Sequence, residues 1–128
     1  MERFSATLSG ENQIPPNNSP FSGSLIVIFN TRAQFIRVQV SSTITNATGA
    51  SIHVGMAGTR GPIKINFSRI NGVVQNLPPT PIQDDVVYAL RSGNLYFEIY
   101  TAEYPDGEIR GQIEYSRTFF FFFFFFFF

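Results

Sequence analysis

Short runs in which apolar and polar residues alternate, separated by glycine, proline, asparagine and aspartate, constrain the fold of this chain most strongly. The stretches 36–41, 95–100 and 109–114 each carry an apolar residue or a glycine at every second position. Side chains on a strand point alternately to opposite faces, so this spacing predicts strands with one buried face. No stretch before residue 117 shows a sustained period of 3.6, and we therefore expect an all-β domain without a helix.

We expect about seven or eight strands, spaced by roughly ten to fifteen residues, in one domain that spans residues 1–116. This pattern is typical of a single antiparallel two-sheet β-sandwich with Greek-key connections, and a barrel is the alternative. The stretch 23–29 is a continuous apolar strand candidate. The stretch 85–90 fits either a strand or a single helical turn, and Asp84-Asp85 is expected to be a solvated loop end.

Ten consecutive phenylalanines close the printed sequence and follow the last expected strand through residues 116–118. Burying one Phe side chain is worth roughly 1.5–3 kcal/mol, so ten rings left in water forgo on the order of 15–30 kcal/mol. We therefore expect residues 117–128 to be a separate segment that is buried outside the domain, against other copies of the chain. The residues expected to drive this assembly are Phe119, Phe120, Phe121, Phe122, Phe123, Phe124, Phe125, Phe126, Phe127 and Phe128.

Three interpretations of this segment remain open. It can pack between subunits of an oligomer or filament, for which strand addition to a neighbouring sheet is one geometry. It can instead anchor the chain at a membrane interface, although no basic cluster accompanies it. It can also be an addition to the natural sequence. A run of ten is too short for a transmembrane helix, which needs about 20 apolar residues.

Charge and composition exclude several functions. Nine basic and nine acidic residues give no net charge, so the basic stripe that nucleic-acid binding needs is absent, and self-association is easy. The chain has no cysteine, which excludes disulfides and cysteine-based metal sites. The first residues lack a basic region followed by an apolar run. We therefore expect synthesis in the cytoplasm without a signal peptide, and a cell or spore surface is a possible destination.

Four stretches carry motifs that together resemble the CHRD domain family, named for chordin. Residues 4–16 are similar to F-x-A-x-L-x-G followed by a Pro-Pro pair, and residues 52–62 resemble H-I-H-x-G-x-x-G-x-x-G-P. Residues 93–101 resemble G-x-L-Y-V-N-V-H-T, and residues 105–112 match P-x-G-E-I-R-G-Q fully. The resemblance implies a β-sandwich of immunoglobulin or Cu,Zn-dismutase type. It also implies an extracellular, surface or structural module with no established catalytic activity.

The chain departs from the family at three histidines that are the family's plausible metal-binding set. The paired histidines are here Ser51 and His53, and the third is Tyr100. Zinc and copper sites usually need three or four ligands, so a single imidazole argues against a metal site in this member. We expect no cofactor. His53 remains the lone candidate ligand or general base, and the interpretation that we favour is a hydrogen-bonded structural residue.

The sequence shows no recognisable group of catalytic residues, and we expect a protein that is not an enzyme. Ser51 lies on the same strand face as His53, but nothing nominates an orienting acid or an oxyanion hole. Pro105–Glu108 offers carboxylates for calcium but is better explained as a hairpin turn, in which Gly107 supplies a positive φ. Residues 55–62 form a glycine-punctuated loop with the wrong context for a phosphate site.

The remaining candidates are binding residues. Tyr96, Tyr100 and Tyr104 are expected to be exposed aromatic contacts for an unknown ligand. Arg110 either joins them or pairs with Glu98 or Glu108 across the sheet, and Gly111 is expected to let a neighbouring segment approach closely. Our first hypothesis is thus a structural subunit that assembles through its Phe segment. The alternatives are a surface binding or adhesion module and a vestigial dismutase-like metal-binding domain.

Overall fold

The computed structural model of the chain describes residues 1–67 and 74–116, which form nine strands, one α-helix and one short 3-10 helix. The helices are η1 (Gly10–Asn12) and α1 (Asp84–Arg91). The strands are β1 (Glu2–Ser9), β2 (Ser22–Asn30), β3 (Phe35–Ser42), β4 (Ala47–Val54), β5 (Ile63–Phe67), β6 (Val74–Asn76), β7 (Thr80–Pro81), β8 (Leu95–Thr101) and β9 (Ile109–Tyr115).

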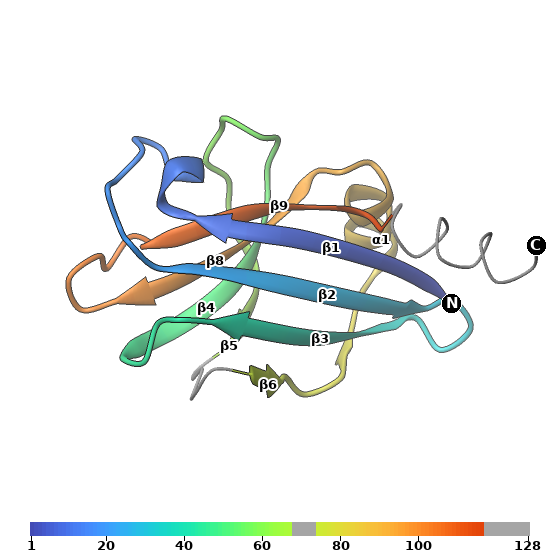
Figure 1. Cartoon of the computed structure of the whole chain (residues 1–128). Coiled ribbons are helices and arrows are strands. Elements are labelled where there is room, and N and C mark those ends of the chain that lie inside the picture. Colours follow the sequence, from blue (N-terminus) through green and yellow to red (C-terminus); the bar gives the residue numbers. More distant parts are fainter. Residues whose placement is uncertain (68–73, 117–128) are drawn as a thin grey trace, which may run out of the picture.

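One antiparallel sheet contains these strands in the order β5-β4-β8-β9-β1-β2-β3-β6, and β7 also pairs with β3. The sheet curls into a half-barrel, so that β1, β2 and β3 face β4, β5 and β8 across the interior (Figure 1). The all-β prediction is confirmed. The expected division into two sheets is not found in the described residues, because the ladder is continuous from β5 to β6.

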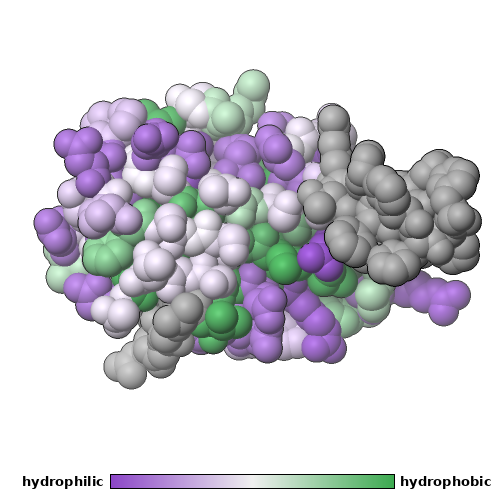
Figure 2. Space-filling model, in the orientation of Figure 1, coloured by the Kyte–Doolittle hydropathy of each residue, from purple (hydrophilic) through white to green (hydrophobic). Residues whose placement is uncertain are grey.

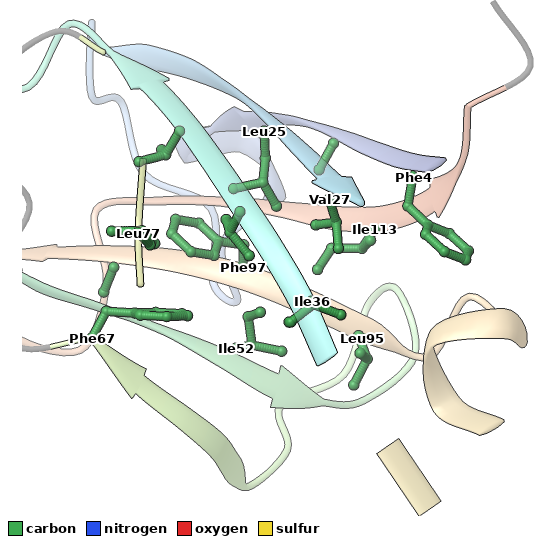
Figure 3. Packing of buried hydrophobic residues seen from close by; sticks show 14 of the residues in the cluster. Phe4, Leu25, Val27, Ile36, Ile52, Phe67, Leu77, Leu95, Phe97 and Ile113 are labelled. Atoms are coloured by element: carbon green, nitrogen blue, oxygen red, sulfur yellow. The ribbon is translucent and has the colours of Figure 1, made fainter. Parts of the chain in front are cut away.

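The core lies inside the curl, where the apolar side chains of opposing strands meet (Figure 3). Leu25 and Val27 of β2 point to the same interior as Ile52 of β4 and Phe97 of β8. Each such burial stabilises the fold by roughly 1.5–3 kcal/mol. The largest fully buried apolar residues of this core include Phe4, Leu8, Leu25, Phe29, Ile36, Ile44, Ile52, Leu90, Leu95, Phe97 and Ile99.

Of the two alternatives for residues 85–90, the structure has the helical one, extended to the eight residues of α1, and this corrects the assignment of Asp84-Asp85 to a loop end. Both aspartates lie in the first turn of α1 and Arg91 lies in the last turn, where their charges complement the helix dipole. The buried residues are Val86, Ala89 and Leu90, a spacing that matches one helical face. Over eight residues this pattern is too short to separate from a strand by periodicity alone.

No helix of the described residues is long and apolar enough to cross a membrane. The expected domain 1–116 ends with Ser116, the last residue that the structure describes. The expected assembly segment, residues 117–128, lies outside the described residues.

Candidate functional site

A layer of polar side chains covers the outer face of β4, β8 and β9, opposite the apolar core. The pairing places Glu98 opposite Ser51 on one side and opposite Arg110 on the other. The loop 55–62, which joins β4 to β5, packs over this layer. Buried members of the layer are Ser51, His53, Tyr96, Glu98 and Arg110. Burial of polar groups costs free energy unless they form hydrogen bonds. The hydrogen bonds within the layer therefore show which of its groups are left to react or to bind a ligand.

His53 lies at the centre of the layer and is 7% exposed. Its Nδ1 lies 2.8 Å from the carbonyl oxygen of Gly61, so Nδ1 carries a proton and donates it to that carbonyl. Its Nε2 lies 2.7 Å from Ser51 Oγ and 2.7 Å from the hydroxyl of Tyr100. The same Nε2 lies 3.1 Å from Glu98 Oε2. The Ser51 and Tyr100 hydroxyls also bond to each other.

This arrangement constrains where protons can be. Since Nδ1 donates to Gly61, the neutral ring of His53 presents only a lone pair at Nε2. The Ser51 and Tyr100 hydroxyls can donate to that lone pair, but an ionised Glu98 cannot. Glu98 and His53 therefore attract each other only when a proton lies between them. The hydroxyls are bonded within the layer and Ser51 is fully buried, so a substrate cannot reach its hydroxyl.

The structure brings together the three positions that the family resemblance singled out, Ser51, His53 and Tyr100. Of these three residues and the other members of the polar layer, only His53 and Glu98 have side chains that usually bind metals. Within residues 1–67 and 74–116, no group of three or more histidine, cysteine or acidic side chains is gathered. Two such ligands do not fit the three or four that zinc and copper sites usually have.

Tyr96 departs from its expected exposure, because it is 2% exposed and lies inside the layer. Its ring stacks on that of His53, with centroids 4.7 Å apart and planes at 10°. The guanidinium of Arg110 lies over the same ring, 3.5 Å from its centre. The Tyr96 hydroxyl accepts a hydrogen bond from the Gly61 N–H at 2.9 Å. Tyr96 therefore fixes the loop 55–62 and separates the His53 ring from the Arg110 guanidinium.

The other two expected aromatic contacts occupy different surroundings. Tyr100 is half-buried in the His53 cluster, and burial raises the pKa of its hydroxyl to about 12. Tyr104 is half-buried at the β8–β9 turn, away from that cluster. The turn itself confirms the hairpin prediction, because Gly107 has a φ of 124° and its N–H donates to the Tyr104 carbonyl. Glu108, a proposed calcium ligand, instead accepts hydrogen bonds from side chains of the domain.

Arg110 lies opposite Glu98 as the cross-strand pairing predicts, but its guanidinium extends toward the loop 55–62. It donates to the Met56 carbonyl at 3.2 Å, and burial lowers the pKa of Arg110 below its ordinary value. Gln112 donates from Nε2 to the carbonyls of Gly55 at 2.7 Å and Gly93 at 2.9 Å. Arg110 and Gln112 therefore bind the backbone of this loop to β9.

A groove of about 550 Å³ lies between the loop 55–62 and residues 10–17. Both segments rise from the same side of the sheet (Figure 1). The polar residues that line the groove are Ser5, Thr7, Glu11, Asn12, Gln13, Arg110, Gln112 and Glu114. Only Arg110 of these was singled out from the sequence. The sequence could have indicated Gln112, since alternation places it on the same strand face as Arg110. No sequence pattern indicated Gln13.

Gly111 confirms the predicted close approach of a neighbouring segment. A Cβ at this position would lie 2.2 Å from the Thr7 carbonyl oxygen of β1. Beside it, Asn12 Nδ2 donates to the Arg110 carbonyl at 2.9 Å and holds η1 against β9. The glycine therefore keeps β1 and β9 close where the groove crosses them.

The comparisons with known proteins identify a family and no individual relative. A model of the CHRD domain matches residues 4–113. Neither the curated proteins nor the solved structures gave a match. The family match spans most of the chain and includes the strands that carry the polar layer and the groove. The chain belongs to the CHRD domain family.

Proposed function

We propose that this chain is a non-enzymatic structural subunit that self-associates through Phe119–Phe128. The observation that carries the proposal is the run of ten phenylalanines that begins at residue 119, soon after β9, a strand that lies between β8 and β1 inside the sheet. Pairing continues to the last described residue, because the Ser116 N–H donates to the Arg3 carbonyl at 3.0 Å. A mechanical force on the Phe segment would thus be transmitted through β9 to the central strands of the sheet.

Side chains reinforce this end of the domain. The Tyr115 hydroxyl lies 2.7 Å from Glu2 Oε1, and its ring lies 4.4 Å from that of Phe4. Arg91 of α1 donates to Glu2 Oε2 at 2.6 Å, which lowers the pKa of Glu2. Strands β1 and β9 and helix α1 are therefore joined at the C-terminal end of β9, as a subunit that carries mechanical load through the segment after β9 would require.

An acceptor for the Phe rings is available on the outer face of β2 and β3. A groove of about 410 Å³ there is lined by Ile26 and Ile28, with Arg3 and Arg37 beside them. We call it the β2 groove. In Figure 2, hydrophobic residues lie among hydrophilic ones near the middle of this face. Strand β2 is apolar on both faces, a pattern typical of strands that are covered on both sides. Arginines beside the groove suit aromatic rings.

We place rings of a neighbouring copy in the β2 groove. Each Phe ring has roughly 150–250 Å² to bury, so ten of them need much more apolar surface than Ile26 and Ile28 offer. Contacts among Phe segments of several copies supply the remainder. The buried polar layer supports the non-enzymatic part of the proposal, since its hydroxyls and its histidine bond to each other and to the backbone.

The test is to compare the full chain with a variant that ends at Thr118, by sedimentation velocity in detergent-free buffer. We expect a distribution of large species for the full chain and a monomer for the truncated one. In the full chain, Ile28→Arg should shift the distribution toward smaller species, whereas Ser24→Arg on the same face of β2 should not. An unchanged distribution on truncation would refute the proposal.

A second candidate, a binding or adhesion domain at a cell or spore surface, is favoured by the groove beside Arg110. In that case the truncated monomer would keep its ligand, and the Phe segment would serve only as an anchor. Retention of truncated and full-length protein on the same surface preparation separates the two candidates.

A further inference from the structure

We propose that the groove between residues 10–17 and the loop 55–62 binds a small zwitterionic ligand, with a carboxylate on Arg110 and Gln13 and an amine at the rim. An amino acid or a short peptide has this chemistry. The proposal is independent of self-association, because the groove lies on β1 and β9 and does not involve the Phe segment.

The first observation is that Arg110 is 2% exposed yet lacks a carboxylate partner. Buried arginines are normally paired with an opposite charge. Here the guanidinium contacts the Tyr96 ring and donates to the Met56 carbonyl. Among the described residues, no carboxylate lies within ion-pairing distance of it: Glu98 attracts it from the paired position on β8, but its Oε2 lies at His53 Nε2. The planar fork of Arg110 thus has donors left for a carboxylate in the groove.

The second observation is independent and concerns Gln13, which is 7% exposed and lines the same groove. Its Nε2 is buried and has no hydrogen-bond partner among residues 1–67 and 74–116. A buried donor without an acceptor destabilises the fold, and one that lines a groove is satisfied when a ligand brings an oxygen. Arg110 and Gln13 therefore both line this groove, and Gln13 Nε2, which lies beside Gly107, has a donor without an acceptor among the described residues.

The charges around the groove select among anions. Glu11 and Glu114 line it too, and both are exposed, so they repel an anion of higher charge such as phosphate. The same carboxylates attract an amine. One buried cation with two exposed acidic groups therefore complements a ligand with one carboxylate and one ammonium group. The volume of about 550 Å³ lies within the range of small-ligand sites.

Equilibrium dialysis of the full chain against isotope-labelled alanyl-alanine tests the proposal, since it does not depend on the oligomeric state. We expect saturable binding that unlabelled alanyl-alanine displaces. The C-terminal amide of the dipeptide, which lacks the carboxylate, and inorganic phosphate should compete at least ten-fold less well. Absence of saturable binding, or phosphate competing as well as the dipeptide, would overturn it.

Variants locate the site without disturbing Arg110, which also supports the loop. Gln13→Leu removes the unpartnered donor and should weaken binding by roughly ten-fold or more, since it bonds to a charged ligand oxygen. Gln39→Leu, on the outer face of β3 away from this groove, is the matched control and should bind as the natural chain does. Equal affinities for the two variants would place the dipeptide elsewhere and overturn the assignment. Circular dichroism spectra that superimpose show that both variants are folded.

Discussion

The guanidinium of Arg110 lies 3.5 Å from the centre of the Tyr96 ring, on the outer face of the sheet. His53 stacks on the same ring, so the Tyr96 ring separates the imidazole of His53 from the guanidinium of Arg110. Contact of a cation with an aromatic face is worth about 0.5–2 kcal/mol, more when water is excluded. Tyr96 is therefore central to the polar layer, and its hydroxyl connects that layer to the loop 55–62.

Removal of the Tyr96 hydroxyl should loosen this loop while the stacked ring remains. In Tyr96→Phe, the Gly61 N–H loses its acceptor, and we expect a loss of about 1 kcal/mol in the free energy of unfolding. Hydrogen exchange of residues 55–62 should become faster. Tyr88→Phe, on the exposed face of α1, is the matched control and should change neither quantity. Equal exchange in both variants would mean that the hydroxyl does not hold the loop.

A double-mutant cycle on His53 and Glu98 should show strong coupling. Removing one partner of a buried pair leaves the other without compensation, so His53→Ala should cost about 3 kcal/mol in the free energy of unfolding. Glu98→Gln in the same background replaces the unpaired acid by a neutral group. The double variant should therefore lose less than the sum of the single losses, by about 0.5–3 kcal/mol in urea unfolding. Additive losses would show that the 3.1 Å contact between His53 and Glu98 contributes nothing to stability.

Tyr100 should make the domain sensitive to alkaline pH. Burial raises the pKa of its hydroxyl from 10.0 to about 12, although its bond to Ser51 acts in the opposite direction. In the unfolded chain the hydroxyl ionises near pH 10, whereas in the folded domain it stays neutral to a higher pH. Its contribution to stability is thus complete below pH 10 and is lost as the pH rises through about 12.

The measurement is urea unfolding at a series of pH values for the natural chain and for Tyr100→Phe. The natural chain should lose stability more steeply over that alkaline interval, and the difference between the two chains should be constant below it. Tyr88→Phe serves as the control for an exposed tyrosine and should follow the natural chain. A Tyr100→Phe curve parallel to the natural one throughout would show that Tyr100 ionises equally in both states.

The sequence predicts the strands well because their alternation reports which face is buried. Strands β3, β8 and β9 lie within a residue or two of the expected stretches, and the apolar stretch 23–29 became β2. Periodicity could not separate the eight residues of α1 from a strand, since two helical turns give few repeats. The short strands β6 and β7 have two or three residues each and carry no periodic signal.

The site was only partly predictable for a related reason. Alternation places Tyr96, Glu98 and Arg110 on one face, but it cannot show that the loop 55–62 covers that face. Tyr96 is consequently buried where exposure was expected. The position of Gln13 depends on how the irregular residues 10–17 pack against β9. No local sequence pattern predicts that contact. Ser51, His53 and Tyr100 could be grouped in advance because the family resemblance singled out their three positions.

The close approach of β1 and β9 at Gly111 gives the last prediction. In Gly111→Ala the new methyl group would lie 2.2 Å from the Thr7 carbonyl oxygen and 2.8 Å from Leu8 Cδ2. The backbone oxygen cannot rotate away as a flexible side chain would, so the two strands must separate. We expect a loss of about 1–3 kcal/mol and faster hydrogen exchange along β1 and β9. Gly93→Ala, which meets no atom within 4 Å but has a φ of 75°, should instead disturb only the α1–β8 connection. Unchanged exchange in β1 would show that the sheet accommodates a side chain at Gly111.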